Sequence, residues 1–168
     1  RRDRGLRRQW GLGDDGFVAI YVGRIAAEKN LPLAVRAFRE LQKTRPEAKF
    51  AWVGDGPARE QLQRDNPDFI FCGVQRGEEV ARHFASGDLF VFASHSETFG
   101  NVTLEALASG VPTIAFDYGA AREVLRDGVH GAAIACTGDA NHDDAGFIAA
   151  AMRLAADDAL RMHMRDAC

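Results

Sequence analysis

Two cations in one short loop are the first residues of this chain whose types and spacing suit chemistry. Arg24 and Lys29 lie in the stretch GRIAAEKN at residues 23–30, between an apolar run and a helical pattern. Arginine offers a planar fork of N–H donors, lysine a point charge, and the N-terminus of the helix that follows favours anions. The pair therefore suits a diphosphate. Taken alone, the loop slightly favours a simpler interpretation, a solvated loop whose cations pair with Glu28.

A second stretch, SHSETFGNVTLE at residues 94–105, carries two carboxylates and a glycine around the start of a predicted helix. A helix that begins near Asn101 turns its free N–H groups toward a ligand, and Gly100 permits close approach of a phosphate. Glu105 lies one turn further along the same face, where an acid beside a phosphate is useful if it binds sugar hydroxyls. In the alternative, Glu97 is a partner of the helix dipole and Glu105 an exposed helix residue.

Other chemistries leave little trace in the sequence. His95 follows a predicted strand, but a lone loop histidine is more often a surface residue than a base. Gly54 and Gly56 form part of a dinucleotide fingerprint that lacks its third glycine, and no GxxxxGK[ST] phosphate loop occurs. The three cysteines are widely spaced and form no CxxC pair. They indicate reduced thiols in the cytoplasm and predict neither a disulfide framework nor a metal site.

Short apolar runs that alternate with amphipathic stretches must position these residues. The apolar runs predict strands at residues 17–22, 50–53, 69–72, 89–93, 113–116 and 132–135. Helical patterns cover residues 31–41, 59–64, 78–86, 102–109, 121–125 and 147–164. On the helix at 102–109, we expect Leu104, Leu107 and Ala108 to face the core.

This alternation predicts βαβ units with right-handed crossovers, and so a Rossmann-like three-layer α/β/α fold around a parallel sheet of about six strands. In such sheets ligands bind beyond the carboxyl ends of the strands. Both candidate loops directly follow predicted strands. The fold therefore brings the cations of the first loop and the carboxylates of the second to one edge of the sheet.

Composition limits the class of protein. The chain has 168 residues, of which 46% are hydrophobic and 27% charged, and its formal net charge is −3. These values are typical of one globular domain and exclude intrinsic disorder. Without a basic excess, non-specific binding of nucleic acid is not expected. No apolar run approaches the roughly 18 residues that span a bilayer.

Taken together and in order, five motifs are more specific than any one of them. They are Val22-Gly23-Arg24 with Lys29, then VGDGP at residues 53–57, FCGV at 71–74, ETFG at 97–100 and LEALASGVP at 104–112. In this order they resemble the donor-binding, C-terminal domain of retaining glycosyltransferases of family four (group 1), which have the GT-B fold. The resemblance covers residues 17–134. Its most diagnostic element is the pair Glu97 and Glu105, with seven residues between them.

The resemblance implies a role for each matching residue. Arg24 and Lys29 match the basic pair that holds the donor diphosphate and stabilises it as the leaving group. Glu97 matches the acid that contacts hydroxyls of the donor sugar, and Glu105 the acid that binds the ribose. Val74 matches the position whose backbone meets the nucleobase. The implied binding site is completed by Gly23, Phe99, Gly100, Asn101 and Val102.

The resemblance also implies a reaction. Such enzymes transfer a sugar from a nucleoside-diphosphate sugar with retention of configuration and without an essential metal, so we expect neither cofactor nor metal here. GDP-mannose or UDP-glucose is the expected donor, and a lipid, polysaccharide or other glycan of the bacterial cell envelope the expected acceptor. The alternatives are a non-catalytic nucleotide-binding module and a nucleotide-sugar epimerase-like domain, and the spacing of the two glutamates speaks against the epimerase.

The ends of the chain predict a fragment, because it lacks an initiator Met and stops within a helical pattern. We expect residues 1–16 to be a linker remnant and residues 17–168 the nucleotide-sugar-binding domain. A GT-B enzyme has two such halves, so the acceptor half is expected to be an absent N-terminal domain of the same chain. Alone, the fragment is then expected to transfer no sugar. A cytoplasmic location is expected, with any membrane association provided by the absent half.

Overall fold

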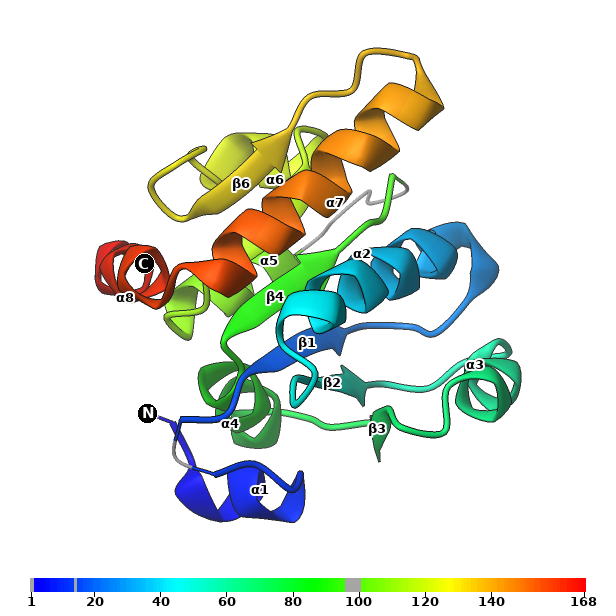
Figure 1. Cartoon of the computed structure of the whole chain (residues 1–168), viewed down its shortest axis with the longest axis vertical. Helices are drawn as coiled ribbons and strands as arrows, with labels where there is room; N and C mark the ends of the chain where they lie inside the picture. The colour runs from blue at the N-terminus through cyan, green and yellow to red at the C-terminus, as the bar shows by residue number, and fades with distance from the viewer. Residues whose placement is uncertain (1, 14, 96–100) are drawn as a thin grey trace.

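The structure of the chain is a computed structural model that describes residues 2–13, 15–95 and 101–168. In these residues six strands form one sheet in the order β3-β2-β1-β4-β5-β6, and every neighbouring pair is parallel (Figure 1). The strands are β1 (Val18–Val22), β2 (Lys49–Val53), β3 (Ile70–Gly73), β4 (Leu89–Phe92), β5 (Thr113–Phe116) and β6 (Gly131–Ile134). The predicted fold class is confirmed.

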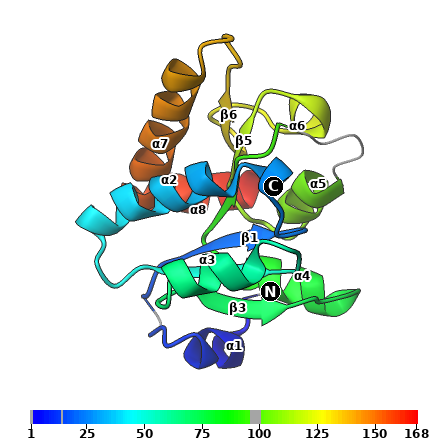
Figure 2. The same cartoon turned by 90° about the vertical axis from the view of Figure 1, so that its right-hand side faces the viewer.

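Helices cover both faces of this sheet. Their bounds are α1 (Arg4–Gln9), α2 (Leu31–Thr44), α3 (Arg59–Asp65), α4 (Glu78–Ser86), α5 (Asn101–Ala108), α6 (Gly119–Val124), α7 (Ala140–Ala156) and α8 (Asp158–Ala167), with a short 3₁₀ turn, η1, at Ala27–Lys29. On one face α7 packs along α2, and on the other α5 contacts both α4 and α6 (Figures 1 and 2). Both faces of the sheet are therefore covered, as in doubly wound α/β proteins.

The core is centred on β1, whose five residues are all buried because β2 and β4 pair with its two edges and helices cover its two faces. Aromatic rings fill the space beside it. The ring centroid of Trp52 on β2 lies 4.6 Å from that of Tyr21 and 4.6 Å from that of Phe50. Burial of such large side chains supplies much of the favourable free energy of folding, roughly 25 cal/mol per Å² of apolar surface. This packing also fixes the position of the carboxyl end of β1, where the next loop begins.

Two sequence predictions about helices are wrong. The expected helix at residues 147–164 is in fact two, α7 and α8, which part at Asp157. The carboxylate of Asp157 accepts a 2.8 Å hydrogen bond from the backbone N–H of Leu160, so this residue caps the start of α8. On α5, Leu107 is buried as expected, but Leu104 is 52% exposed and Ala108 is exposed too, and the other buried side chains are Thr103 and Ala106.

The first sixteen residues, which the sequence pattern assigns to a linker, contain α1. Its Leu6 is buried, and Trp10 and Leu12, which follow, join the same hydrophobic core. Arg7 is only 2% exposed, and its guanidinium donates to the carbonyl of Ser86 and to the carboxylate of Asp88. The described residues of this segment therefore pack as part of the domain, with α1 against α4 and Arg7 bonded to Asp88 just before β4.

Candidate functional site

The candidate site lies at the carboxyl ends of β1 and β4. The strand order reverses between these two neighbours, because β2 and β3 extend the sheet to one side and β5 and β6 to the other. In open α/β sheets, the loops at such a reversal diverge and leave a crevice for a ligand. Here they are the loop of residues 23–30 and the segment that leads from β4 into α5.

The loop after β1 is held by its neighbour after β2. The backbone N–H of Gly23 donates to the carbonyl of Val53 at 2.9 Å, and that of Ile25 donates to the carbonyl of Asp55, also at 2.9 Å. Ala58 donates in turn to the carbonyl of Ile25 at 3.0 Å. These bonds continue the β1–β2 pairing beyond the strands, so the loop has a defined path.

Gly54 and Gly56 are what this close approach requires. A Cβ on Gly54 would lie 1.9 Å from the carbonyl oxygen of Gly23, and one on Gly56 would lie 2.2 Å from that of Ile25. No side chain fits at these distances. The two glycines of the incomplete dinucleotide fingerprint therefore serve the packing of one loop on another, and they face backbone of this chain.

Arg24 lies exposed on this fixed loop. Its carbonyl accepts a 2.8 Å hydrogen bond from the hydroxyl of buried Tyr21, and its guanidinium lies 3.1 Å from the carboxylate of Glu28. The side chains of Arg24 and Glu28 are 64% and 47% exposed, and exposed pairs of this kind contribute about 0–1 kcal/mol. The pairing with Glu28 foreseen as the simpler interpretation is present. It is weak enough for a stronger anion to replace it.

Lys29 ends η1 and is half-buried. The next residue, Asn30, has left-handed backbone (φ 52°, ψ 44°) and turns the chain into α2. Asparagine tolerates this conformation better than most residues. The turn places Lys29 beside the N-terminus of α2, at the same edge of the sheet as Arg24.

Across the reversal, α5 begins at Asn101, as predicted. Asn101 and Glu105 are both exposed, one turn apart on the same helix, whereas Val102 is half-buried. Thr103, on the same first turn, lines a small cavity together with Ser94 after β4 and Tyr118 after β5. The amino end of α5 thus lies at the carboxyl edge of the sheet. Glu97, Phe99 and Gly100 fall outside the described residues.

Val74 extends the site toward the outer strands. It follows β3, which is two strands away from β1, and its side chain is 58% exposed. Strands in a sheet lie about 4.8 Å apart, so the end of β3 is roughly 10 Å from that of β1 along the edge. A ligand that joins these positions has to be elongated.

His95 and Cys136 meet at the same edge. The ring of His95 lies 3.9 Å, centroid to centroid, from that of Phe116, and its Nδ1 lies 4.0 Å from the sulfur of Cys136. Partial desolvation and the negative charges of Asp143 and Asp117 raise the pKa of the Cys136 thiol. The thiol is therefore kept protonated and is a poor nucleophile.

Sequence reasoning passed over Tyr118 and Arg122. Tyr118 follows β5 and is 48% exposed, and Arg122 on α6 is paired with Asp117 at 3.2 Å. The available signal was the place of Tyr118 soon after the predicted strand at residues 113–116, whereas Arg122 lies in the predicted helix at residues 121–125. Among the residues that the structure describes, no group of three His, Cys, Asp or Glu side chains has the geometry of a metal site. Nor is any helix in the described ranges both long and apolar enough to cross a membrane.

The fold and this edge define a Rossmann-like α/β domain with basic side chains and a helix N-terminus at its switch point. The family model for glycosyl transferases group 1 matches residues 16–157, so the chain belongs to that family.

Individual proteins that this chain resembles are named as glycosyltransferases. The chain is 41% identical over 126 residues to a GDP-mannose-dependent alpha-mannosyltransferase of Mycolicibacterium smegmatis, a match that covers 74% of this chain and 32% of the relative. A crystal structure of the pneumococcal O-GlcNAc transferase GtfA in complex with UDP and GlcNAc superposes with a TM-score of 0.77 and 27% identity, over 89% of this chain and 31% of that one.

A third comparison matches nearly whole chains. The C-terminal domain of a group 1 glycosyl transferase from Francisella tularensis has a TM-score of 0.77 and 23% identity, over 98% of this chain and 89% of that one, and so shares the fold. By contrast, the chain spans 22 to 32% of the length of the first curated relatives that it matches.

Proposed function

We propose that this chain is the donor-binding half of a glycosyltransferase and holds a nucleoside-diphosphate sugar at the carboxyl edge of its sheet. The observation that carries the proposal is the position of the Arg24–Lys29 loop and the amino end of α5 on the two sides of the β1/β4 reversal. The membership of residues 16–157 in the glycosyl transferase group 1 family supports it.

Each part of the donor has a place along this edge. Arg24 and Lys29, with the backbone of Gly23, bind the diphosphate, and the start of α5 at Asn101 and Val102 faces it from the other side. Glu105 binds the ribose, and the backbone of Val74 meets the nucleobase. In this proposal Phe99 and Gly100 complete the loop over the phosphates, and Glu97 contacts the sugar.

The proposed reaction uses charges that are in place before it begins. Cleavage of the bond between sugar and diphosphate builds negative charge on the diphosphate and positive character on the sugar. Cations and N–H groups aimed at the phosphates stabilise that state without having to reorganise. Fixing the donor and acceptor in one orientation supplies a further part of the rate. We propose that the acceptor attacks the face that the nucleotide leaves, so that configuration is retained.

We propose GDP-mannose or UDP-glucose as donor, and a lipid or polysaccharide as acceptor. Support for the donor class comes from the relatives, one of which is named for GDP-mannose, while another was crystallised with UDP. In this proposal the acceptor is bound by a second domain in the whole protein. The chain by itself then binds donor and transfers no sugar, and measurable turnover by the pure chain would contradict this last point.

The test of donor binding is calorimetric titration of the chain with UDP, GDP, ADP and NAD, beside the variant Arg24→Ala/Lys29→Ala. We expect one nucleoside diphosphate to bind and the double variant to weaken it about a hundredfold, because two charge-assisted contacts are lost. The matched control is Lys43→Ala/Arg64→Ala, which removes two exposed cations from α2 and α3. Equal loss in both variants, or binding of none of the four nucleotides, would overturn the proposal.

A second arm separates catalysis from mere nucleotide binding. In the whole protein, Glu97→Gln is expected to abolish most sugar transfer while nucleotide binding by the chain persists. Glu60→Gln, on exposed α3, is its control. Undiminished transfer in Glu97→Gln would favour the non-catalytic module. Recovery of an isomerised nucleotide-sugar in place of a transferred sugar would favour an epimerase.

A further inference from the structure

A second concave site lies at the opposite edge of the sheet, at the amino ends of the strands. It is a cavity of about 350 Å³, bordered by Gly16 just before β1, by Asp88 just before β4, and by α8. Its volume lies at the lower end of the range for small-molecule sites, which is about 300–1,000 Å³. The length of β1 separates it from the donor edge.

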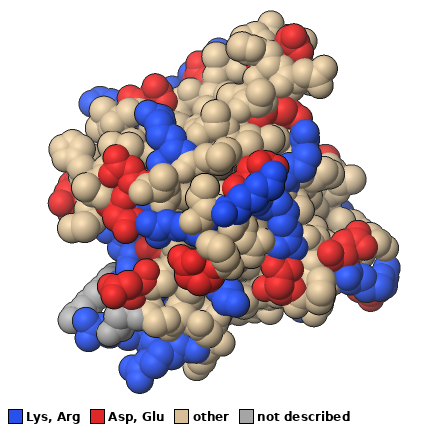
Figure 3. Space-filling model, in the orientation of Figure 1, with Lys and Arg blue, Asp and Glu red and all other residues tan. Residues whose placement is uncertain are grey.

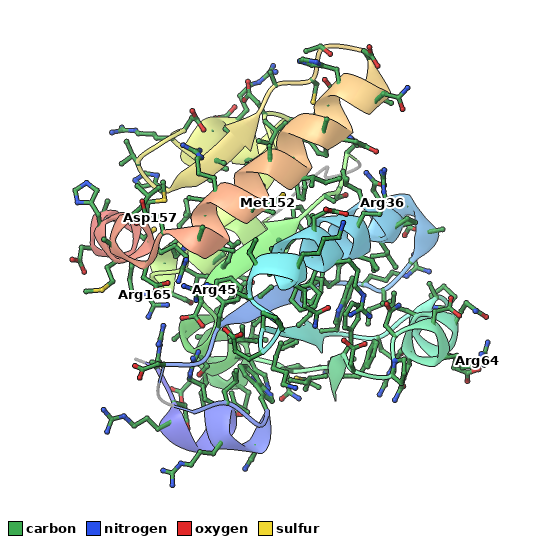
Figure 4. All side chains as sticks on the ribbon, in the orientation of Figure 1. Arg36, Arg45, Arg64, Met152, Asp157 and Arg165 are labelled. Carbon is green, nitrogen blue, oxygen red and sulfur yellow. The ribbon has the colours of Figure 1, made fainter. Side chains whose placement is uncertain are left out.

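Arginines dominate the lining of this cavity. Arg2, Arg45, Arg161 and Arg165 face it, together with three aspartates. Arg161 and Arg165 are one turn apart on α8 and so share a helix face, whereas Arg45 follows the end of α2. Arg45 and Arg165 lie on this flank of the molecule (Figure 4). Basic and acidic side chains are interleaved over the face that α2, α7 and α8 present, so the charge left for a ligand depends on which carboxylates are already paired (Figure 3).

Two of the three carboxylates are already paired with arginines, although Asp158 uses only its Oδ1 atom and its side chain is 65% exposed. Asp88 accepts from the backbone N–H of Val18 at 2.9 Å, from Arg7 at 3.0 Å, and from Arg2. Asp158 accepts from Arg45 at 2.6 Å and from Arg161. The third, Asp15, is exposed to solvent. Because Arg7 also stands against Asp88, the guanidinium groups around the cavity outnumber the carboxylates.

Three of the arginines keep donors in reserve. Arg2 uses one nitrogen on Asp88, Arg45 one on Asp158, and Arg165 one on the carbonyl of Gly87 at 2.7 Å. Each guanidinium carries five N–H donors. Within the described ranges, the remaining nitrogens of these three groups have no hydrogen-bond acceptor in the protein. Arg161, by contrast, also donates to the carbonyls of Leu154 and Ala155 and is already committed.

The crowding of like charge has an energetic consequence. Burial lowers the pKa of Arg165, and the positive charges of Arg2 and Arg7 lower it further, although Asp88 works in the opposite direction. The cationic form of Arg165 is thus held at a cost in free energy. An anion that enters the cavity reduces that cost, and this is a driving force for binding in addition to the direct hydrogen bonds.

We propose that this cavity binds a phosphate group through Arg2, Arg45 and Arg165. Guanidinium forks that converge from three segments of chain suit a tetrahedral anion with several acceptor oxygens, because each fork can hold a separate oxygen or pair of oxygens. The volume accommodates a group attached to the phosphate. That group belongs either to a free phosphorylated metabolite or to the head of a phospholipid.

The test uses a background in which the donor site is silent, so that phosphate bound at the two edges is not confused. In the Arg24→Ala/Lys29→Ala chain, calorimetric titration with inorganic phosphate and pyrophosphate is expected to show one saturable site. Adding Arg45→Gln or Arg165→Gln is expected to weaken binding about tenfold each, the effect of one lost charged contact. Arg64→Gln on α3, at the far side of the molecule in Figure 4, is the matched control and leaves the affinity unchanged.

Folding and ligand source are checked in the same series. Arg165→Lys keeps the charge but loses the fork, and we expect it to bind more weakly than the parent and more tightly than Arg165→Gln at an unchanged melting temperature. Phosphatidylcholine vesicles with and without phosphatidic acid form the second arm. Binding only to those with phosphatidic acid, sensitive to Arg45→Gln, identifies a lipid headgroup, whereas binding of the free anions alone identifies a soluble ligand. Failure of both arms, or equal weakening by Arg64→Gln, would overturn the proposal.

Discussion

At the scale of single residues, the two glycines after β2 show how a ligand-like motif can serve packing. Gly-x-Gly after a strand is commonly read as room for a phosphate. Here the room is filled by the carbonyl oxygens of Gly23 and Ile25. The loop that carries Arg24 is thereby fixed from behind, so these glycines affect the site through the backbone they support.

Gly56→Ala therefore tests a purely steric requirement. Its new Cβ would lie 2.2 Å from the carbonyl oxygen of Ile25, which is backbone and cannot rotate away. We expect the free energy of unfolding, measured with guanidinium chloride, to fall by about 3 kcal/mol or more. The control is Gly13→Ala, where no atom lies within 4 Å and the change should stay within about 0.5 kcal/mol. Equal stability of the two variants would contradict the packing role.

The residues of the candidate site divide into those that sequence could place and those it could not. Arg24, Lys29 and Asn101 were predicted from loops that follow apolar strands, and the structure has them at the expected edge. The phase of α5 was not predictable, because Val102, Leu104, Ala106 and Leu107 give it apolar residues on almost every side. Only contact with the sheet and α6 decides that Leu104 is exposed. The roles of individual residues stay predictions.

At the scale of elements, a buried arginine on α1 adds polar contacts to the hydrophobic packing that holds this helix on the domain. The guanidinium of Arg7 donates to the carbonyl of Ser86 at the end of α4 and to the carboxylate of Asp88 just before β4. It also donates to the carbonyl of Gly16 just before β1. In a sequence such a residue cannot be told from the exposed arginines beside it. Two of its three partners, Ser86 and Asp88, lie about eighty residues away along the chain, beyond the reach of local patterns.

Removal of this link should be costly. Arg7→Ala leaves the buried carboxylate of Asp88 with fewer partners and the carbonyl of Ser86 without its donor. We expect a loss of about 3–5 kcal/mol in the free energy of unfolding, the usual effect of removing one partner of a buried ion pair. Arg8→Ala is the matched control, since Arg8 is exposed and bonds only within α1 at 3.3 Å. The free energies are measured by unfolding in urea, followed by circular dichroism. Equal stability of Arg7→Ala and Arg8→Ala would contradict the proposed role of Arg7.

The other boundary that sequence missed has a local cause. In residues 147–164 the helical spacing of apolar residues continues across the break between α7 and α8, so the hydrophobic pattern does not indicate that a helix ends at Asp157. The signal was the capping preference of aspartate, which the hydrophobic pattern ignores. The boundaries of the strands were predicted more accurately than those of the helices, because buried parallel strands are short, continuous apolar runs bounded by glycine or polar residues.

At the scale of the whole molecule, several carboxylates with lowered pKa values make the free energy of unfolding depend on pH in the acid range. The pKa of Asp68 is lowered by its hydrogen bond from Arg39, that of Asp143 by the hydroxyl of Thr137, and that of Asp3 by the backbone N–H of Leu6. Each folded value lies below the ordinary 3.8. Their stabilisation is therefore complete above that value and is lost as the pH falls through the lower, folded ones.

We accordingly expect the free energy of unfolding to fall as the pH is lowered below about 4, and these groups to give it almost no pH dependence between roughly pH 5 and 7, where their stabilisation is fully present. Asp68→Asn/Asp143→Asn should be less stable at pH 6 and should lose less on acidification. Glu47→Gln, which removes an exposed carboxylate, is the control variant. An acid slope of the double variant equal to that of the parent would contradict the assignment.

The strand order also bears on how the chain acquires its shape during synthesis. β1 and β4 are neighbours at the centre of the sheet, yet β2 and β3 with three helices come between them in the chain. As the polypeptide leaves the ribosome, β1 can pair with β2 early, but its other edge stays open until β4 emerges. The pairing of β1 with β4 is slow, because it closes a long loop of chain. For that interval β1, a strand whose five residues are all buried in the folded domain, has one uncovered edge, which is the kind of surface that chaperones bind.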